Sequence, residues 1–301
     1  MSGRLSNYKN LEKRLAVQKK MSDKVRIKGS GFENLSFLHG VLRRGLKILN
    51  MEKRGLENVI NFKLIEREVT LKGLNEFWHG KRILHLSDTH LDGVPGLLEK
   101  LQEEIPKLKY DLCVFTGDFR FGKGAFHPAQ LAPTLQLLES IEAPLGVFGI
   151  LGNHDFLDQV EPLEEKGMRV LLNESIDLGN DLYLAGVDDP HLYMCEDLKE
   201  AMNEIPKEAK KILLVHSPES VQEASDLNAD VYLCGHTHGG QIGFPVIGKP
   251  FINARCSRSF ASGEFEYNGM QGYTHNGTGA SSVAARFNCP SEIVIHTLRG
   301  M

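Results

Sequence analysis

Two histidines, His236 and His238, follow the apolar run that begins the stretch "VYLCGHTHGGQ". Four other apolar runs end in metal-binding residue types, and these are Asp88 and His90, then Asp118, then Asn153, His154 and Asp155, and finally His216. Imidazole nitrogens together with carboxylate and amide oxygens suit Mn²⁺, Fe or Zn²⁺ better than Ca²⁺. Without His154 and Asp155 these residues supply seven donors, which are too many for one ion. The pattern therefore predicts two ions that share a carboxylate.

The spacing of these donors predicts the elements that hold them. Apolar runs at 81–90, 111–118, 145–155, 182–189, 211–218, 231–238 and 292–298 are typical of buried strands, and helical patterns lie near 94–108, 128–142, 160–167, 196–204 and 218–225. Alternating strands and helices predict an α/β fold with largely parallel sheets. Ligands of such folds collect beyond the carboxyl ends of the strands, so five strand ends would converge on one site.

The DxH and HxH spacings add a local expectation. In an extended backbone, side chains two residues apart point to the same face. We therefore expect Asp88 and His90 to face one side together, and His236 and His238 likewise, provided that the backbone stays extended.

The charge distribution divides the chain. Residues 1–72 hold 17 Lys and Arg against 7 Asp and Glu, whereas the remainder holds 18 against 32. We expect a basic arm over residues 1–60 and one catalytic domain over residues 61–301. A basic arm indicates an anionic partner, and an acidic domain argues against a broad nucleic-acid footprint.

One segment of the arm has the pattern of an amphipathic helix. In "LSFLHGVLRRGLKIL" (35–49) the leucines share one stripe, and Arg43, Arg44 and Lys47 lie on the narrower polar face. A helix of this kind can lie on an anionic membrane surface. It can equally pack against the domain, and the sequence favours neither alternative.

Composition narrows the setting of the protein. No apolar run is long enough to cross a membrane, and the first twenty residues lack the apolar segment of a secretory signal. The five cysteines are odd in number and form no CxxC pair, which suits a reducing compartment. We expect a cytoplasmic protein, with peripheral attachment to the inner face of the plasma membrane as a further expectation.

In chain order the motifs "DTH", "GDF", "GNHD", "VH" and "GHTH", within residues 81–240, resemble those of the calcineurin-like metallophosphoesterase family. The resemblance implies a four-layer αββα sandwich and a hydrolase with two divalent ions, Mn²⁺ expected and Fe or Zn²⁺ as alternatives. Carried over residue by residue, one ion would bind Asp88, His90, Asp118 and His238, and the second would share Asp118 with Asn153, His216 and His236. A hydroxide between the ions would attack phosphorus, with His154 as the catalytic residue at the leaving oxygen.

The stretches "GHTHGGQIGFP" and "NGTGASSVAARFNCPSEIVIHTL" look like those of a bacterial, often membrane-associated branch of the family. That branch includes enzymes of lipid A synthesis that cleave UDP-2,3-diacylglucosamine. The resemblance implies a phosphorylated small-molecule or lipid substrate. A generic phosphodiesterase or nuclease and a non-catalytic scaffold are the alternatives.

The chain departs from the family pattern at one position. Many members carry an aspartate three residues after the "GD" aspartate, where it orients the catalytic histidine, but Phe121 stands there in this sequence. Another group must orient His154, and Asp155 is the nearest candidate in the sequence.

Overall fold

The computed structural model describes residues 4–23, 36–122, 124–243 and 252–301. Within these residues the strands form two six-stranded sheets. The first sheet has the order β1 (Lys63–Leu71), β12 (Glu292–Gly300), β2 (Arg82–Leu86), β3 (Leu112–Phe115), β4 (Val147–Gly149) and β5 (Met168–Val170). The second has the order β10 (Gly263–Tyr267), β11 (Met270–Thr274), β9 (Val231–Cys234), β8 (Lys210–Leu214), β7 (Leu182–Gly186) and β6 (Glu174–Asp177).

The strands that precede the predicted ligands run parallel. In the first sheet β2, β3, β4 and β5 are parallel, while β12 is antiparallel to β2 and parallel to β1. In the second sheet β7, β8, β9 and β11 are parallel, and the edge strands β6 and β10 are antiparallel to their neighbours. Within each parallel set, the carboxyl ends of the strands therefore lie at the same edge of the sheet.

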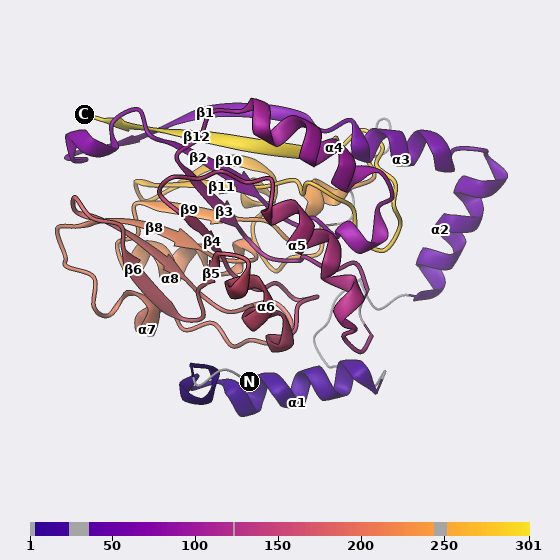
Figure 1. Ribbon diagram of the computed structural model, residues 1–301, viewed down its shortest axis with the longest axis horizontal. Coiled ribbons are helices and arrows are strands. Elements are labelled where there is room, and N and C mark those ends of the chain that lie inside the picture. The colour runs from indigo at the N-terminus through magenta and orange to yellow at the C-terminus, as the bar shows by residue number, and fades with distance from the viewer. Residues whose placement is uncertain (1–3, 24–35, 123, 244–251) are drawn as a thin grey trace.

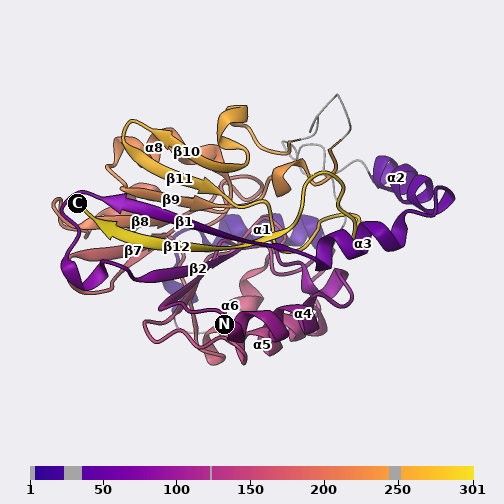
Figure 2. The same ribbon diagram turned by 90° about the horizontal axis from the view of Figure 1, so that it is seen from above.

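Three layers of apolar side chains separate four layers of structure. The helices of the domain are α4 (Leu97–Glu104), α5 (Ala132–Leu138), α6 (Val160–Glu165), α7 (Leu198–Met202) and α8 (Val221–Asp226). Strand alternation divides the core, since Ile83 and Val114 pack between the sheets whereas Leu84 and Phe115 face α4, α5 and α6. Leu213 packs with α7 and α8 on the opposite side. The predicted αββα sandwich is confirmed (Figure 2).

The predicted strands differ from the observed ones mainly in length. The run at 145–155 contributes only β4, because the residues after Gly149 leave the sheet and form the loop that carries Asn153 and His154. Strands β1, β5, β6, β10 and β11 were not predicted. Strand β6 is short and only partly buried, and β1 exposes several polar residues, so neither shows a continuous apolar run.

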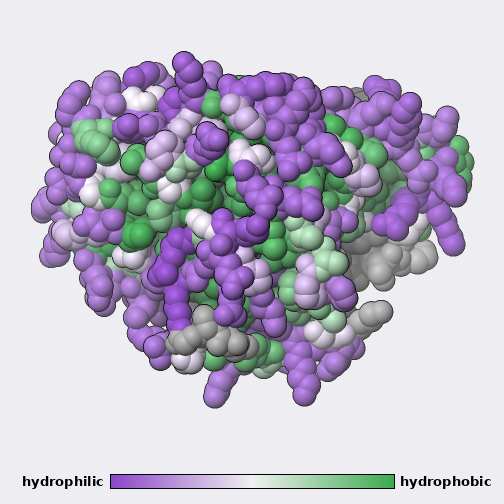
Figure 3. Space-filling model, in the orientation of Figure 1, coloured by the Kyte–Doolittle hydropathy of each residue, from purple (hydrophilic) through white to green (hydrophobic). Residues whose placement is uncertain are grey.

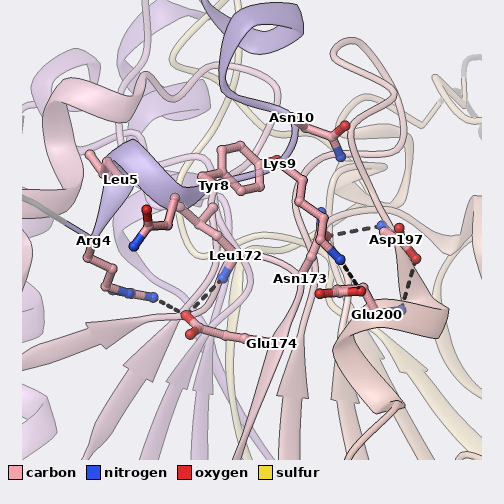
Figure 4. Close-up of a pocket in the computed structure, with 11 residues that line it drawn as sticks. Arg4, Leu5, Tyr8, Lys9, Asn10, Leu172, Asn173, Glu174, Asp197 and Glu200 are labelled. Carbon is pink, nitrogen blue, oxygen red and sulfur yellow. Dashed lines mark hydrogen bonds and ion pairs between the residues drawn. The ribbon is translucent and has the colours of Figure 1, made fainter.

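Among the described residues, three α-helices precede the sheets, namely α1 (Leu11–Ser22), α2 (Ser36–Ile48) and α3 (Glu52–Ile60), and they lie on the outside of the sandwich (Figure 1). Helix α1 buries Arg14, Gln18 and Met21 against the domain. Two basic residues just before it contact acidic residues of the domain. Arg4 pairs with Glu164 and Glu174, and Lys9 pairs with Glu200. Figure 4 shows the pairs with Glu174 and Glu200. The basic arm was expected to meet an anionic partner, and for Arg4 and Lys9 this partner is the acidic surface of the protein itself.

Helix α2 has two different faces. Leu46 is buried against Val283 and Ala285, with Leu42 packed beside it. Val41 and Ile48 are 52% and 83% exposed. At the end of the molecule where Figure 1 places α2 and α3, apolar and polar surface lie side by side (Figure 3). Leu35 and the side chains of residues 36–39, which complete the predicted stripe, lie outside the described part. Among the described residues, no helix combines the length and apolar character needed to span a membrane.

Candidate metal centre

The predicted ligands come together at the carboxyl ends of strands from both sheets. The first sheet contributes Asp88 and His90 after β2, Asp118 after β3 and Asn153 after β4; the second contributes His216 after β8 and His236 and His238 after β9. All seven side chains are buried. Three overlapping groups have donor atoms close enough to hold a metal ion, and these are Asp88 with His90 and His238, His90 with Asp118 and His154, and Asp118 with His216 and His236.

The first group, with Asp118 beside it, surrounds one position. Oδ1 of Asp88 lies 3.3 Å from Nε2 of His238. Nε2 of His90 lies 3.3 Å from that same nitrogen and 3.7 Å from Oδ2 of Asp118. Four side chains thus direct two carboxylate oxygens and two imidazole nitrogens at a common space.

The second group adjoins the first through Asp118. Oδ2 of Asp118 lies 3.4 Å from Nε2 of His216. The amide oxygen of Asn153 lies 2.9 Å from that nitrogen and 2.8 Å from Nδ1 of His236. Asp118 therefore stands between the two groups, as a shared carboxylate must.

Backbone carbonyls fix which ring nitrogen faces the centre in three of the histidines, His90, His216 and His236. A carbonyl only accepts, so the nitrogen beside it carries hydrogen and the other nitrogen of a neutral ring holds a lone pair. The contacts are His90 Nδ1 with Arg120 O at 2.6 Å, His216 Nδ1 with Thr116 O at 2.7 Å, and His236 Nε2 with Asn253 O at 2.5 Å. In the neutral rings all three lone pairs point inward. Converging lone pairs beside carboxylates fit a cation.

The backbone of these loops is not extended, so the expected reason for the convergence is wrong. Asp88, His90, Asp118, His236 and His238 all have positive φ, between 43° and 70°. Residues other than glycine seldom adopt this left-handed region, and such residues cluster at functional sites. Tight left-handed turns, rather than strand alternation, bring the two members of each DxH and HxH pair to the centre.

Buried charges influence one another within the site. Burial alone would raise the pKa of Asp118, but His216, His154 and His90 outweigh it and hold the pKa well below its usual range. Burial raises the pKa of Asp88 to about 6, and the charge of Asp118 adds to this effect. Asp118 is therefore the more firmly ionised of the two carboxylates, which suits a position between two cations.

His154 is oriented by a backbone group. Its Nδ1 lies 3.1 Å from the carbonyl oxygen of Phe121, and its Nε2 lies 4.0 Å from Oδ2 of Asp118. The expectation that Asp155 would orient this ring is wrong for Nδ1. The Asp155 carboxylate instead accepts from the backbone N–H groups of Asp118 at 2.7 Å and of Gly152 at 2.8 Å. The residue that replaces the family aspartate thus supplies an acceptor through its main chain.

Arg286 is a residue of the site that the sequence did not reveal. Its buried guanidinium donates to the carbonyl oxygens of Gly279 at 2.8 Å and Asn276 at 2.5 Å, and Nη2 lies 3.0 Å from Nδ1 of His238. Burial, followed by the charge of Arg286, lowers the pKa of His238 well below its usual range. The ring therefore stays unprotonated near neutral pH, as a metal ligand requires.

The calcineurin-like phosphoesterase family matches residues 81–240, more than half of the chain. An uncharacterized metallophosphoesterase of Aquifex aeolicus is 30% identical over 73% of this chain and 85% of its own length. The uncharacterized metallophosphoesterase YkuE of Bacillus subtilis is 29% identical over 73% and 79%. The UDP-2,3-diacylglucosamine pyrophosphatase LpxG of Chlamydia trachomatis is 28% identical over 56% and 66%.

The fold and the buried His/Asp groups define a metal-dependent phosphoesterase. The chain belongs to the calcineurin-like phosphoesterase family. The assignment of each ligand to an ion and the role of His154 remain predictions.

Proposed function

We propose that this phosphoesterase cleaves a lipid-linked or nucleotide-sugar diphosphate, such as UDP-2,3-diacylglucosamine, at the surface of an anionic membrane. Asp88, His90, Asp118 and His238 hold one divalent ion, and Asp118 with Asn153, His216 and His236 holds the second. Mn²⁺ is the expected metal, and Fe or Zn²⁺ are the alternatives. Bound ions of this kind neutralise phosphate charge and supply hydroxide near neutral pH.

His154 contributes the proton chemistry in this proposal. Its Nδ1 is held by the Phe121 carbonyl, and its Nε2 points toward the metal centre, 4.0 Å from Oδ2 of Asp118. Because Nδ1 carries the hydrogen that the Phe121 carbonyl accepts, Nε2 can donate only when the ring is protonated. We infer that this protonated ring gives the leaving oxygen either a hydrogen bond or its Nε2 proton, and becomes neutral in the second case. The carbonyl fixes the plane of the ring without adding a negative charge beside the phosphate.

The observation that carries the substrate class is the surface of α2. Val41 and Ile48 project into solvent on a helix that also carries Arg43, Arg44 and Lys47. Apolar residues beside cations favour the boundary between anionic headgroups and acyl chains. The likeness to LpxG, whose name gives UDP-2,3-diacylglucosamine as its substrate, points to the same lipid chemistry.

The proposal also assigns parts of the chain. Residues 61–301 form the catalytic domain, and residues 1–60 form an arm whose helix α2 attaches the enzyme to the inner face of the plasma membrane. A phosphodiesterase or nuclease acting on soluble substrates is the alternative, and it has no use for such a helix.

Hydrolysis of UDP-2,3-diacylglucosamine by the Mn²⁺-loaded protein tests the substrate. Release of UMP, abolished by Asp118→Ala, supports the proposal. If the protein hydrolyses bis(p-nitrophenyl) phosphate but not the lipid, the phosphoesterase activity stands and UDP-2,3-diacylglucosamine is rejected as the substrate. A protein that binds no metal and cleaves neither compound contradicts the catalytic assignment itself.

Vesicle flotation tests the role of α2 separately. Vesicles containing phosphatidylglycerol should carry the wild-type protein at low salt, and the double variant Val41→Glu/Ile48→Glu should remain in solution. Leu64→Glu provides the control, because Leu64 is 45% exposed on β1 rather than on α2. Equal flotation of the wild type and the double variant would rule out α2 as the membrane contact.

A further inference from the structure

Helix α1 lies outside the family match yet contributes a fully buried cation to the domain. Arg14 has no exposed surface, and its Nη1 is paired with Oδ1 of Asp188. Its Nη2 donates to the backbone carbonyl of Asp155 at 3.0 Å. Its guanidinium also stacks on the ring of Tyr193, with the carbon 3.6 Å from the ring centroid. A buried arginine with this many partners is fixed in position, unlike a solvated charge. The contacts of Arg14 with Asp188, Asp155 and Tyr193 are called the joint below.

The joint connects the two sheets at the end where the metal centre lies. Asp155 follows β4 in the first sheet, whereas Asp188 follows β7 in the second. The hydroxyl of Tyr193 donates to the same Asp155 carbonyl at 2.9 Å. The hydroxyl of Tyr8, just before α1, donates to Asp188 at 2.5 Å. Because the predicted ligands also come from both sheets, anything that sets the relative position of these loops acts on the metal centre.

A short path leads from Arg14 to the site. Asp155 is covalently joined to His154, and its carboxylate accepts from the backbone N–H of Asp118 at 2.7 Å. Gln18, one turn after Arg14, accepts from the backbone N–H of Leu157 at 3.3 Å. The loop that carries the predicted catalytic histidine is therefore held by α1 on one side and holds the backbone of Asp118 on the other.

We propose that Arg14 is a positioning residue of the metal centre, and that the docked helix α1 acts as a clamp across the two sheets. The proposal rests on the metal site set out above. The clamp fixes the carbonyl of Asp155, so that the Asp155 carboxylate stays aligned on the Asp118 backbone and His154 stays beside the site. A segment remote in the sequence thus completes the active site without touching the substrate.

The residues just before α1 offer a matched control. Lys9, two residues before α1, forms an exposed ion pair with Glu200. In the close-up of the pocket that these residues line, the pair lies at the opposite side from Arg4 and Glu174 (Figure 4). The Lys9 side chain is 69% exposed. Exposed pairs of this kind contribute little. Lys9→Met therefore alters the attachment of α1 without touching the joint at Asp155 and Asp188.

The test compares full-length Arg14→Lys with wild type and with Lys9→Met. Lysine keeps the positive charge for Asp188, but it lacks the planar fork that reaches Asp155 and stacks on Tyr193. Three experiments are made below the unfolding temperature. They measure kcat and KM on bis(p-nitrophenyl) phosphate, Mn²⁺ affinity by calorimetry, and amide hydrogen exchange in the metal-free protein. We expect kcat or Mn²⁺ affinity to fall about 10- to 100-fold, as for other residues that orient ligands. Exchange at the Asp118 and Gly152 amides should become faster, and Lys9→Met should match wild type.

A lower unfolding temperature with unchanged kcat, Mn²⁺ affinity and amide exchange would make Arg14 merely structural and overturn the proposal. If Arg14→Lys fails to fold, Tyr193→Phe replaces it, because this change removes the hydroxyl that donates to the Asp155 carbonyl and contacts Sδ of Met21 on α1, and retains the Arg14–Asp188 pair. Its expected effect has the same direction and a smaller size, and wild-type values would again overturn the proposal. A wild-type protein without metal binding or turnover would instead reject the proposed function, and the exchange rates of metal-free Arg14→Lys would still decide whether the clamp exists.

Discussion

Gly152→Ala should disable the metal centre through one added methyl group. A Cβ at this position would lie 2.2 Å from Oδ1 of Asp118, 2.6 Å from the Asp118 backbone nitrogen and 2.7 Å from Cε1 of His216. Ordinary contacts begin near 3.4 Å, so the nearest overlap exceeds an ångström. Neither neighbour can swing aside, because the Asp118 backbone is held by Asp155 and the His216 ring by the carbonyl of Thr116.

The size of the effect follows from this overlap. A misplacement of about 1 Å at reacting groups costs on the order of 100-fold in rate, which corresponds to about 2.7 kcal/mol in the activation free energy. We expect kcat of Gly152→Ala on bis(p-nitrophenyl) phosphate to fall about 100-fold, with weaker Mn²⁺ binding. Steady-state kinetics and calorimetry on the purified protein measure the two quantities.

Gly167→Ala provides the matched control. Gly167 has φ of +91°, and no atom lies within 4 Å of the place that an added methyl group would take, so alanine strains the backbone without a collision. Its free energy of unfolding should fall by roughly 1–2 kcal/mol, and its kcat should not change. Full Mn²⁺ occupancy together with a kcat for Gly152→Ala close to that of Gly167→Ala would refute the collision argument.

Three further predictions address metal binding, the stability of the fold in acid and the buried side chain of Arg286. Chelation of the metal should abolish hydrolysis and lower the unfolding temperature by about 5–10 °C, because bound ions stabilise only the folded chain. Scanning calorimetry with and without Mn²⁺ measures this shift, and an unchanged unfolding temperature would contradict buried ion binding. Although burial opposes it, the contact with His191 lowers the pKa of Glu219 from 4.5 to about 2, so the ionised side chain stabilises the fold above pH 4.5 and this contribution is lost as the pH falls toward 2. The stability advantage of wild type over Glu219→Gln in urea titrations should accordingly shrink across that window, and a constant difference would oppose the assignment. Arg286→Leu should weaken Mn²⁺ binding at least tenfold in calorimetry, because the carbonyls that the guanidinium holds are released, and wild-type affinity would show that those loops need no such support.

The sequence could point to candidate side-chain donors because each side chain is written directly in it. Asp118, His216 and the other predicted ligands were selected from their order after apolar runs, and the αββα sandwich followed from the family resemblance. Backbone groups, by contrast, are present at every residue, so the sequence does not indicate which of them contact the site. The carbonyls of Thr116 and Phe121 act whatever side chain stands there, so their contacts with His216 and His154 could be found only in three dimensions.

Two other features escaped prediction for different physical reasons. Left-handed φ at aspartate and histidine is imposed by the surrounding loops, against the local preference of those residues, so no local pattern signals it. Arg14 appeared in the sequence as one of many basic residues of the arm, and only the long-range contact with Asp188 distinguishes it. Net charge predicted attraction to an anion, but it could not show that part of the anion is the acidic domain itself.

The place of β12 in the first sheet has a consequence for how the protein matures. This strand lies between β1 and β2, although its residues are synthesised about two hundred positions after those of β2. Until β12 emerges, β1 lacks its partner strand and β2 presents an open edge to other chains. Contacts so distant in the chain form slowly. The nascent protein therefore passes through a period in which it invites misassembly, and chaperone protection is most valuable to it during that interval.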